Sequence, residues 1–91
     1  MDFATKVESE VITHLYTHAR HEDRIRIRLY YPSQKGMIEH EVKSVPVYIT
    51  GAYWPRALAR NFEENIAADC RIRGEEFRPD NLGFQIIFYR D

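Results

Sequence analysis

The residues with the clearest potential for chemistry are three arginines in the stretch DRIRIRLYYP, residues 23–32. Arg24, Arg26 and Arg28 alternate with large apolar residues, and Tyr30 continues their face. In a β-strand, alternate side chains point to one face about 7 Å apart, which is comparable to the phosphate spacing along a nucleic-acid strand. The stripe therefore predicts a strand with one dry face and one face suited to an anionic partner.

A second stretch could neutralise these arginines. Residues 38–43 alternate in the same way, with Glu39 and Glu41 on the polar face, and the loop PSQKG at 32–36 predicts a hairpin. One register that sets inward residues opposite inward residues places Arg28 against Glu39 and Arg26 against Glu41. Exposed pairs of this kind stabilise little. The sequence leaves open whether the arginines are paired or free to bind.

A second candidate surface is GAYWPRALAR, residues 51–60, which contains Tyr53, Trp54, Arg56 and Arg60. Trp, Tyr and Arg dominate binding hot spots because they bury large areas. The alternative is that Trp54 anchors a helix to the core, which a small domain needs. Because Tyr53 and Trp54 are adjacent, we expect at least one of these rings to be accessible.

The histidines do not predict a metal site. His14 and His18 are four residues apart, a spacing that can serve one metal ion on a helix. However, Leu15 stands where zinc proteases have glutamate, and no third ligand is evident. We expect His40 to point inward on the hairpin as a hydrogen-bonded residue at the rim of the core.

Cys70 is the one candidate nucleophile. Arg71 beside it could lower the pKa of its thiol, but Cys70 continues an i+4 stripe of apolar residues, which are Leu58, Phe62 and Ile66. We therefore expect Cys70 to be a core residue.

No other motif predicts catalysis. The glutamate pairs at 63–64 and 75–76 are adjacent in sequence and fit solvated surface better than an acid–base pair. No GxSxG, phosphate-binding glycine loop or dinucleotide fingerprint is present. We expect a protein that is not an enzyme and uses no metal or cofactor.

Composition bounds the class of partner. The 13 Lys and Arg nearly balance the 14 Asp and Glu, so only a local patch could attract a polyanion. One cysteine excludes an internal disulfide and favours a reducing, cytoplasmic location. No apolar run approaches the roughly 18 residues of a membrane span, and the start, MDFATKVESE, lacks a signal-peptide pattern. We expect a cytoplasmic protein with no membrane partner.

Periodicity predicts two helices. Apolar residues recur every four positions from about 2 to 20, with Asp2 as the cap, and again from about 55 to 71, with Gly74 as the stop.

Four strands are predicted in addition: 24–31, 38–43, 44–50 and 84–90. Pro46 implies a break near Ser44, because proline belongs at an edge, at a bulge or at the start of a strand. The last strand is apolar on both faces, which is typical of a strand that is interior or covered on both sides.

These 91 residues predict one domain, 1–91, of the α+β class. The expected order is α-β-β-β-α-β, with a mostly antiparallel sheet and two helices packed on one face. The order helix, three strands, helix resembles that of double-stranded RNA-binding domains, which place basic residues where Arg56 and Arg60 stand. Pro55 and Ala57 interrupt that basic cluster here, so the resemblance is one of topology.

The expected function is that of a small non-catalytic binding protein. It would regulate or inhibit a larger protein or protein–nucleic-acid assembly by occupying its surface. As a class it resembles the small accessory proteins that phages encode against host machinery, such as anti-CRISPR proteins. The alternative is an RNA- or DNA-binding domain that uses the arginine stripe or the start of the second helix. A homodimer through the last strand is expected if that strand lies at a sheet edge.

Overall fold

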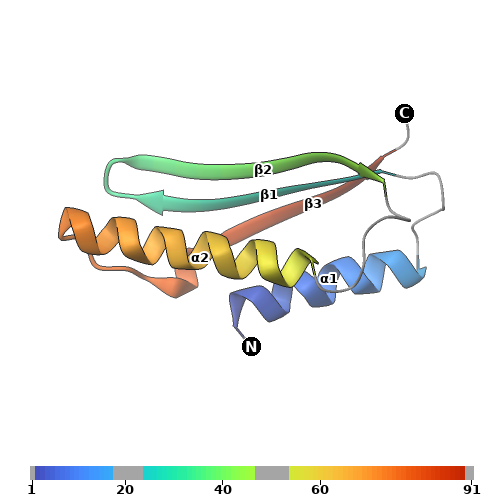
Figure 1. Ribbon diagram of the computed structural model, residues 1–91, viewed down its shortest axis with the longest axis horizontal. Helices are drawn as coiled ribbons and strands as arrows, with labels where there is room; N and C mark the ends of the chain where they lie inside the picture. Colours follow the sequence, from blue (N-terminus) through green and yellow to red (C-terminus); the bar gives the residue numbers. More distant parts are fainter. Residues whose placement is uncertain (1, 18–23, 47–53, 90–91) are drawn as a thin grey trace.

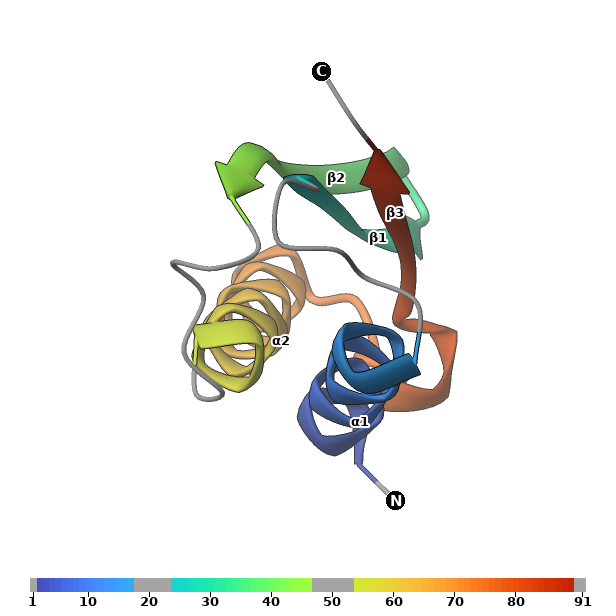
Figure 2. The ribbon, with the colours of Figure 1, turned by 90° about the vertical axis from the view of Figure 1, so that its right-hand side faces the viewer.

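The computed structural model describes residues 2–17, 24–46 and 54–89. Its elements are α1 (Phe3–Thr17), β1 (Arg24–Ser33), β2 (Gly36–Pro46), α2 (Trp54–Arg73), the short 3-10 helix η2 (Pro79–Asn81) and β3 (Gly83–Tyr89). Figures 1 and 2 show both helices on the same side of the sheet. The predicted two-layer α+β class is therefore confirmed.

The sheet has the order β2-β1-β3, and both pairs of strands are antiparallel. Its central strand is β1, whose side chains alternate between buried and half-buried as the sequence predicted. Ile25, Ile27, Leu29 and Tyr31 are at most 1% exposed and form the inner face of the strand.

The predicted break near Ser44 takes the form of a β-bulge. Ile25 pairs with Val45 and Ile27 pairs with Val42, so β2 advances three residues while β1 advances two. The bulge absorbs the extra residue, and β2 continues to Pro46. Proline is tolerated there because it is the last residue of β2, which pairs only with β1 among the described strands. Residues 44–46 thus belong to β2, and 47–50 lie outside the described residues.

The described order is consequently α-β-β-α-β, with two strands between the helices. The predicted α-β-β-β-α-β order had a third strand at 44–50. Its first three residues belong to β2, and the other four lie outside the described residues. The topological likeness to double-stranded RNA-binding domains depended on that third strand, and it is not found in the described part of the chain.

The start of α1 and the end of α2 match what their terminal residues predict. The backbone N–H of Thr5 donates a hydrogen bond of 2.9 Å to Oδ1 of Asp2, which caps α1. Hydrogen bonding by the Thr5 side chain, and then by its backbone amide, lowers the pKa of Asp2. At the end of α2, Gly74 has a φ of 71°, and the amides of Gly74 and Glu75 donate to the carbonyls of Arg71 and Cys70. This Schellman arrangement is the stop that Gly74 predicted.

The core lies between the helices and the inner face of β1. Its buried members from the helices are Phe3, Ala4, Val7, Val11, Ala59, Phe62, Ile66 and Cys70. Cys70 is fully buried, as its place in the apolar stripe predicted. Neither described helix is both long and apolar enough to cross a membrane.

The position of β3 differs from the prediction. Its apolar residues on both faces are typical of an interior strand, yet β3 is an edge strand that pairs only with β1 among the described residues. Six of its seven residues are half-buried, and Gln85 is exposed. An apolar strand therefore forms one edge of the described sheet.

Candidate functional site

The outer face of the sheet is the face that both helices leave uncovered (Figure 2). Four of the predicted binding residues lie there, on β1: Arg24, Arg26, Arg28 and Tyr30. The neighbouring strands add Glu39 and Glu41 from β2, and Gln85, Ile87 and Tyr89 from β3. The prediction that the arginines share the face of β1 that points away from the core is therefore confirmed.

Two of the arginines of this face, Arg26 and Arg28, are paired with glutamates of the next strand. Arg26 Nε lies 3.3 Å from Glu41 Oε1, and Arg28 Nη2 donates a hydrogen bond to Glu39 Oε1. This hydrogen bond raises the pKa of Arg28 above its ordinary value. The question that the sequence left open is thus decided for Arg26 and Arg28, whose charges are each matched by a carboxylate.

The predicted partners are correct, but the predicted register is two residues off. Arg28 lies opposite Glu41, so each arginine reaches its glutamate diagonally. The turn sets this register, because Ser33 pairs with Gly36 and leaves only 34–35 as the loop. The Ser33 hydroxyl donates to the Gly36 carbonyl at 2.8 Å, and the Lys35 amide donates to the same hydroxyl at 3.2 Å. Diagonal neighbours remain within reach of long side chains.

Two tyrosines extend the arginine face. The guanidinium carbon of Arg28 lies 5.0 Å from the centroid of the Tyr30 ring, and that of Arg26 lies 5.6 Å from the Tyr89 centroid. Both distances fall within the range of cation–π attraction. Each guanidinium is held between a carboxylate and an aromatic ring, which favours a defined orientation over free rotation.

Tyr30 also covers the start of β3. A Cβ built on Gly83 would lie 2.3 Å from Cε2 of Tyr30 and 2.7 Å from its hydroxyl oxygen. Gly83 pairs with Tyr30 across the two strands, so the ring lies against the glycine backbone. A side chain at this position would overlap the ring where it now lies, so the ring would have to move.

Gly83→Ala is expected to displace the Tyr30 ring and to lower the free energy of unfolding by about 1 kcal/mol, the upper end for a cross-strand pair. In a Tyr30→Ala background the same change should be neutral or stabilising, because alanine is better than glycine in a strand when nothing clashes. A double-mutant cycle measured by urea unfolding tests this coupling. Equal effects of Gly83→Ala in both backgrounds would contradict it.

The second predicted surface lies at the start of α2, in the helical layer and not on the arginine face. Trp54 is half-buried against the core. Arg56 Nη1 lies 3.5 Å from Glu8 Oε1 of α1, and Arg60 is exposed. Tyr53 lies outside the described residues. The seven predicted binding residues that the structure describes therefore lie on two separate surfaces.

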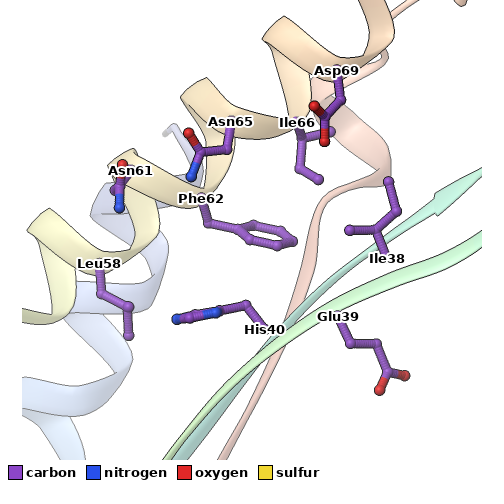
Figure 3. Close-up of a pocket in the computed structure, with 9 residues that line it drawn as sticks. All are labelled: Ile38, Glu39, His40, Leu58, Asn61, Phe62, Asn65, Ile66 and Asp69. Atoms are coloured by element: carbon purple, nitrogen blue, oxygen red, sulfur yellow. The ribbon is translucent and has the colours of Figure 1, made fainter. Parts of the chain in front are cut away.

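The sequence did not predict a groove between β2 and α2 (Figure 3). It encloses about 210 Å³, and its apolar lining comes from Ile38, Leu58, Phe62 and Ile66. The polar lining includes His40 of β2 and three residues at i, i+4 and i+8 of α2: Asn61, Asn65 and Asp69. In the sequence, the only sign of this groove was the polar residues at i+4 spacing beside the apolar stripe of the same helix. His40 is on the helix-facing side of β2, as predicted, but it is exposed, and no hydrogen bond to its side chain is found among the described residues.

The described residues hold no group of three His, Cys, Asp or Glu side chains that could ligate a metal ion. The side chain of His14 and the whole of His18 lie outside the described part. The chain was compared with protein-family models, with curated proteins and with solved structures, and none of them matches it.

Proposed function

We propose that this chain is a non-catalytic protein-binding domain that regulates or inhibits a larger protein or protein–nucleic-acid assembly by occupying its surface. The observation that carries the proposal is the uncovered outer face of the sheet, where paired arginines and glutamates lie beside tyrosine rings. A phage-encoded inhibitor of host machinery, such as an anti-CRISPR protein, is the class that we propose. A cytoplasmic location belongs to the same proposal and rests on the single free cysteine.

The chemistry of this face suits a protein partner. Arginine and tyrosine are enriched in interface hot spots. Because Arg26 and Arg28 are already oriented by Glu39 and Glu41, less side-chain entropy would be lost on binding. Alternating charges also favour a partner with the complementary alternation, which is a source of specificity.

The same pairing weakens the case for nucleic acid. Affinity for a phosphate backbone depends on the number of phosphates that cations neutralise. Here Glu41 and Glu39 already match Arg26 and Arg28, and Glu8 matches Arg56. Direct binding of RNA or DNA is therefore the less favoured function, and the experiment below distinguishes it from binding of a protein.

A charge swap within one ion pair tests the outer face. The double variant Arg28→Glu with Glu39→Arg keeps the pair between these two positions and the net charge but reverses the order of charges on the face. Because it also sets a carboxylate opposite Glu41, circular dichroism must first show that the variant is folded. Affinity capture from the native cell should recover a protein partner with the wild type and lose it with this variant. The matched control swaps Glu8 and Arg56 in the helical layer and should retain the partner.

Three results would contradict the proposal. The first is a partner retained by the outer-face swap, and the second is a partner lost only in the control. The third is steep salt-dependent binding of RNA or DNA oligomers measured at two salt concentrations, which would make phosphates the target.

A further inference from the structure

We propose that β3 pairs with β3 of a second copy of this chain, in antiparallel orientation about Ile86, and so joins two sheets into one of six strands. Figure 2 shows β3 at one border of the sheet, with β1 on its inner side. Its other backbone edge pairs with no strand in the part of the chain that the structure describes. The inference does not depend on the function proposed above.

The two edges of the sheet differ in how they resist pairing. Charged residues, bulges and prolines are the features that block addition of another strand. The β2 edge has all three: exposed Glu39 and Glu41, the bulge between Val42 and Val45, and Pro46. In contrast, β3 (Gly83–Tyr89) contains no charged residue and no proline, and its pairing with β1 is continuous. Of the two edge strands that the structure describes, β3 is therefore the one without these obstacles to pairing.

Several side chains of β3 are apolar but only half-buried. Phe84 and Ile86 pack against the core but remain half-buried, and Ile87 on the outer face is half-buried as well. Apolar residues on both faces are typical of strands inside a sheet. A second copy would turn β3 into such an interior strand. This would explain why an edge strand has apolar residues on both faces.

A second copy is the occupant that fits because the strand is complementary to itself. Ile86 is the midpoint of its seven residues, so antiparallel pairing about Ile86 matches the whole strand. Phe84 then lies opposite Phe88 of the second copy on the inner face, and Gln85 lies opposite Ile87 of the second copy on the outer face. No like charges oppose each other in this register.

The first test is the mass in solution. Light scattering should give a mass near twice the 10.9 kDa of one chain, and the mass should fall on dilution. The double variant Gln85→Lys with Ile87→Lys places lysines opposite lysines at two cross-strand positions on the outer face, away from the core. We expect it to raise the dissociation constant of the dimer by at least about tenfold.

The matched control has the same two positions charged, as Gln85→Lys with Ile87→Glu. In the proposed register each lysine faces a glutamate of the second copy, so this variant should remain a dimer. Far-UV circular dichroism of both variants checks that the monomer is folded. A wild type that is monomeric even in the millimolar range, or equal dissociation constants for the two folded variants, would overturn the proposal.

If the wild type is a dimer and the two variants have equal dissociation constants, the dimer uses a different interface. A wild-type monomer that binds an unrelated extended peptide along β3 would show that the edge serves another partner. Neither result would bear on the charge-swap test of the outer face, because Arg28 and Glu39 lie on β1 and β2.

Discussion

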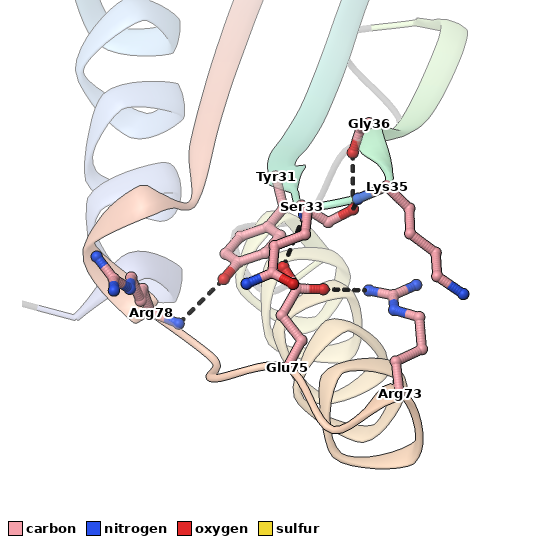
Figure 4. Close-up of polar contacts among 8 residues, drawn as sticks. Tyr31, Ser33, Lys35, Gly36, Arg73, Glu75 and Arg78 are labelled. Atoms are coloured by element: carbon pink, nitrogen blue, oxygen red, sulfur yellow. Dashed lines mark hydrogen bonds and ion pairs between the residues drawn. The ribbon is translucent and has the colours of Figure 1, made fainter.

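Tyr31→Ala is expected to lower the free energy of unfolding by about 3–5 kcal/mol, the usual cost of removing a large buried ring. Tyr31 is 1% exposed, its ring centroid lies 5.7 Å from that of Phe77, and its hydroxyl accepts a hydrogen bond of 3.0 Å from the Arg78 amide (Figure 4). The side chain thus joins the central strand to the segment before η2. Urea unfolding followed by circular dichroism measures the loss.

Tyr31→Phe separates the two contributions of this side chain. It keeps the ring in the core and removes only the hydroxyl, so we expect a loss of about 1 kcal/mol. If Tyr31→Ala fails to fold, the phenylalanine variant still measures the contact with Arg78. A phenylalanine variant as unstable as the alanine variant would contradict the role given to ring burial.

Glu75→Ala is expected to lower the free energy of unfolding by about 2 kcal/mol, because it removes a charged acceptor that is almost buried. The Glu75 side chain is 8% exposed. Its Oε1 accepts a hydrogen bond of 2.8 Å from the Gln34 amide, and its Oε2 lies 3.3 Å from Nη2 of Arg73 (Figure 4). This carboxylate fastens the tip of the β1–β2 hairpin to the end of α2.

Two further variants make this prediction specific. Glu75→Gln retains an oxygen acceptor for Gln34 and should lose about half as much stability as Glu75→Ala. Glu76→Ala is the matched control, because the Glu76 side chain is 78% exposed and should contribute almost nothing. Amide hydrogen exchange at Gln34 should accelerate in Glu75→Ala and stay unchanged in Glu76→Ala. Similar instability of the two alanine variants would contradict the anchoring role of Glu75.

The local elements could be predicted because they depend on neighbours in sequence. The alternation of arginine with apolar residues predicted which side of β1 is buried. The face rule allowed a register in which Glu39 and Glu41 are the partners of Arg28 and Arg26, and left open whether the pairs form. The two-residue turn, which local sequence could have suggested, was not foreseen, and the register was therefore misplaced by two residues.

Three features were decided by the tertiary structure. The edge position of β3 depends on which side of β1 it joins, and the groove depends on how α2 lies across β2. The contact between Gln34 and Glu75 joins residues 41 positions apart. The periodicity of the sequence shows which face of each helix or strand is buried, because apolar residues recur on that face at every turn of helix or every second residue of strand. It contains no information about which elements become neighbours, because that choice is made by the packing of the whole core.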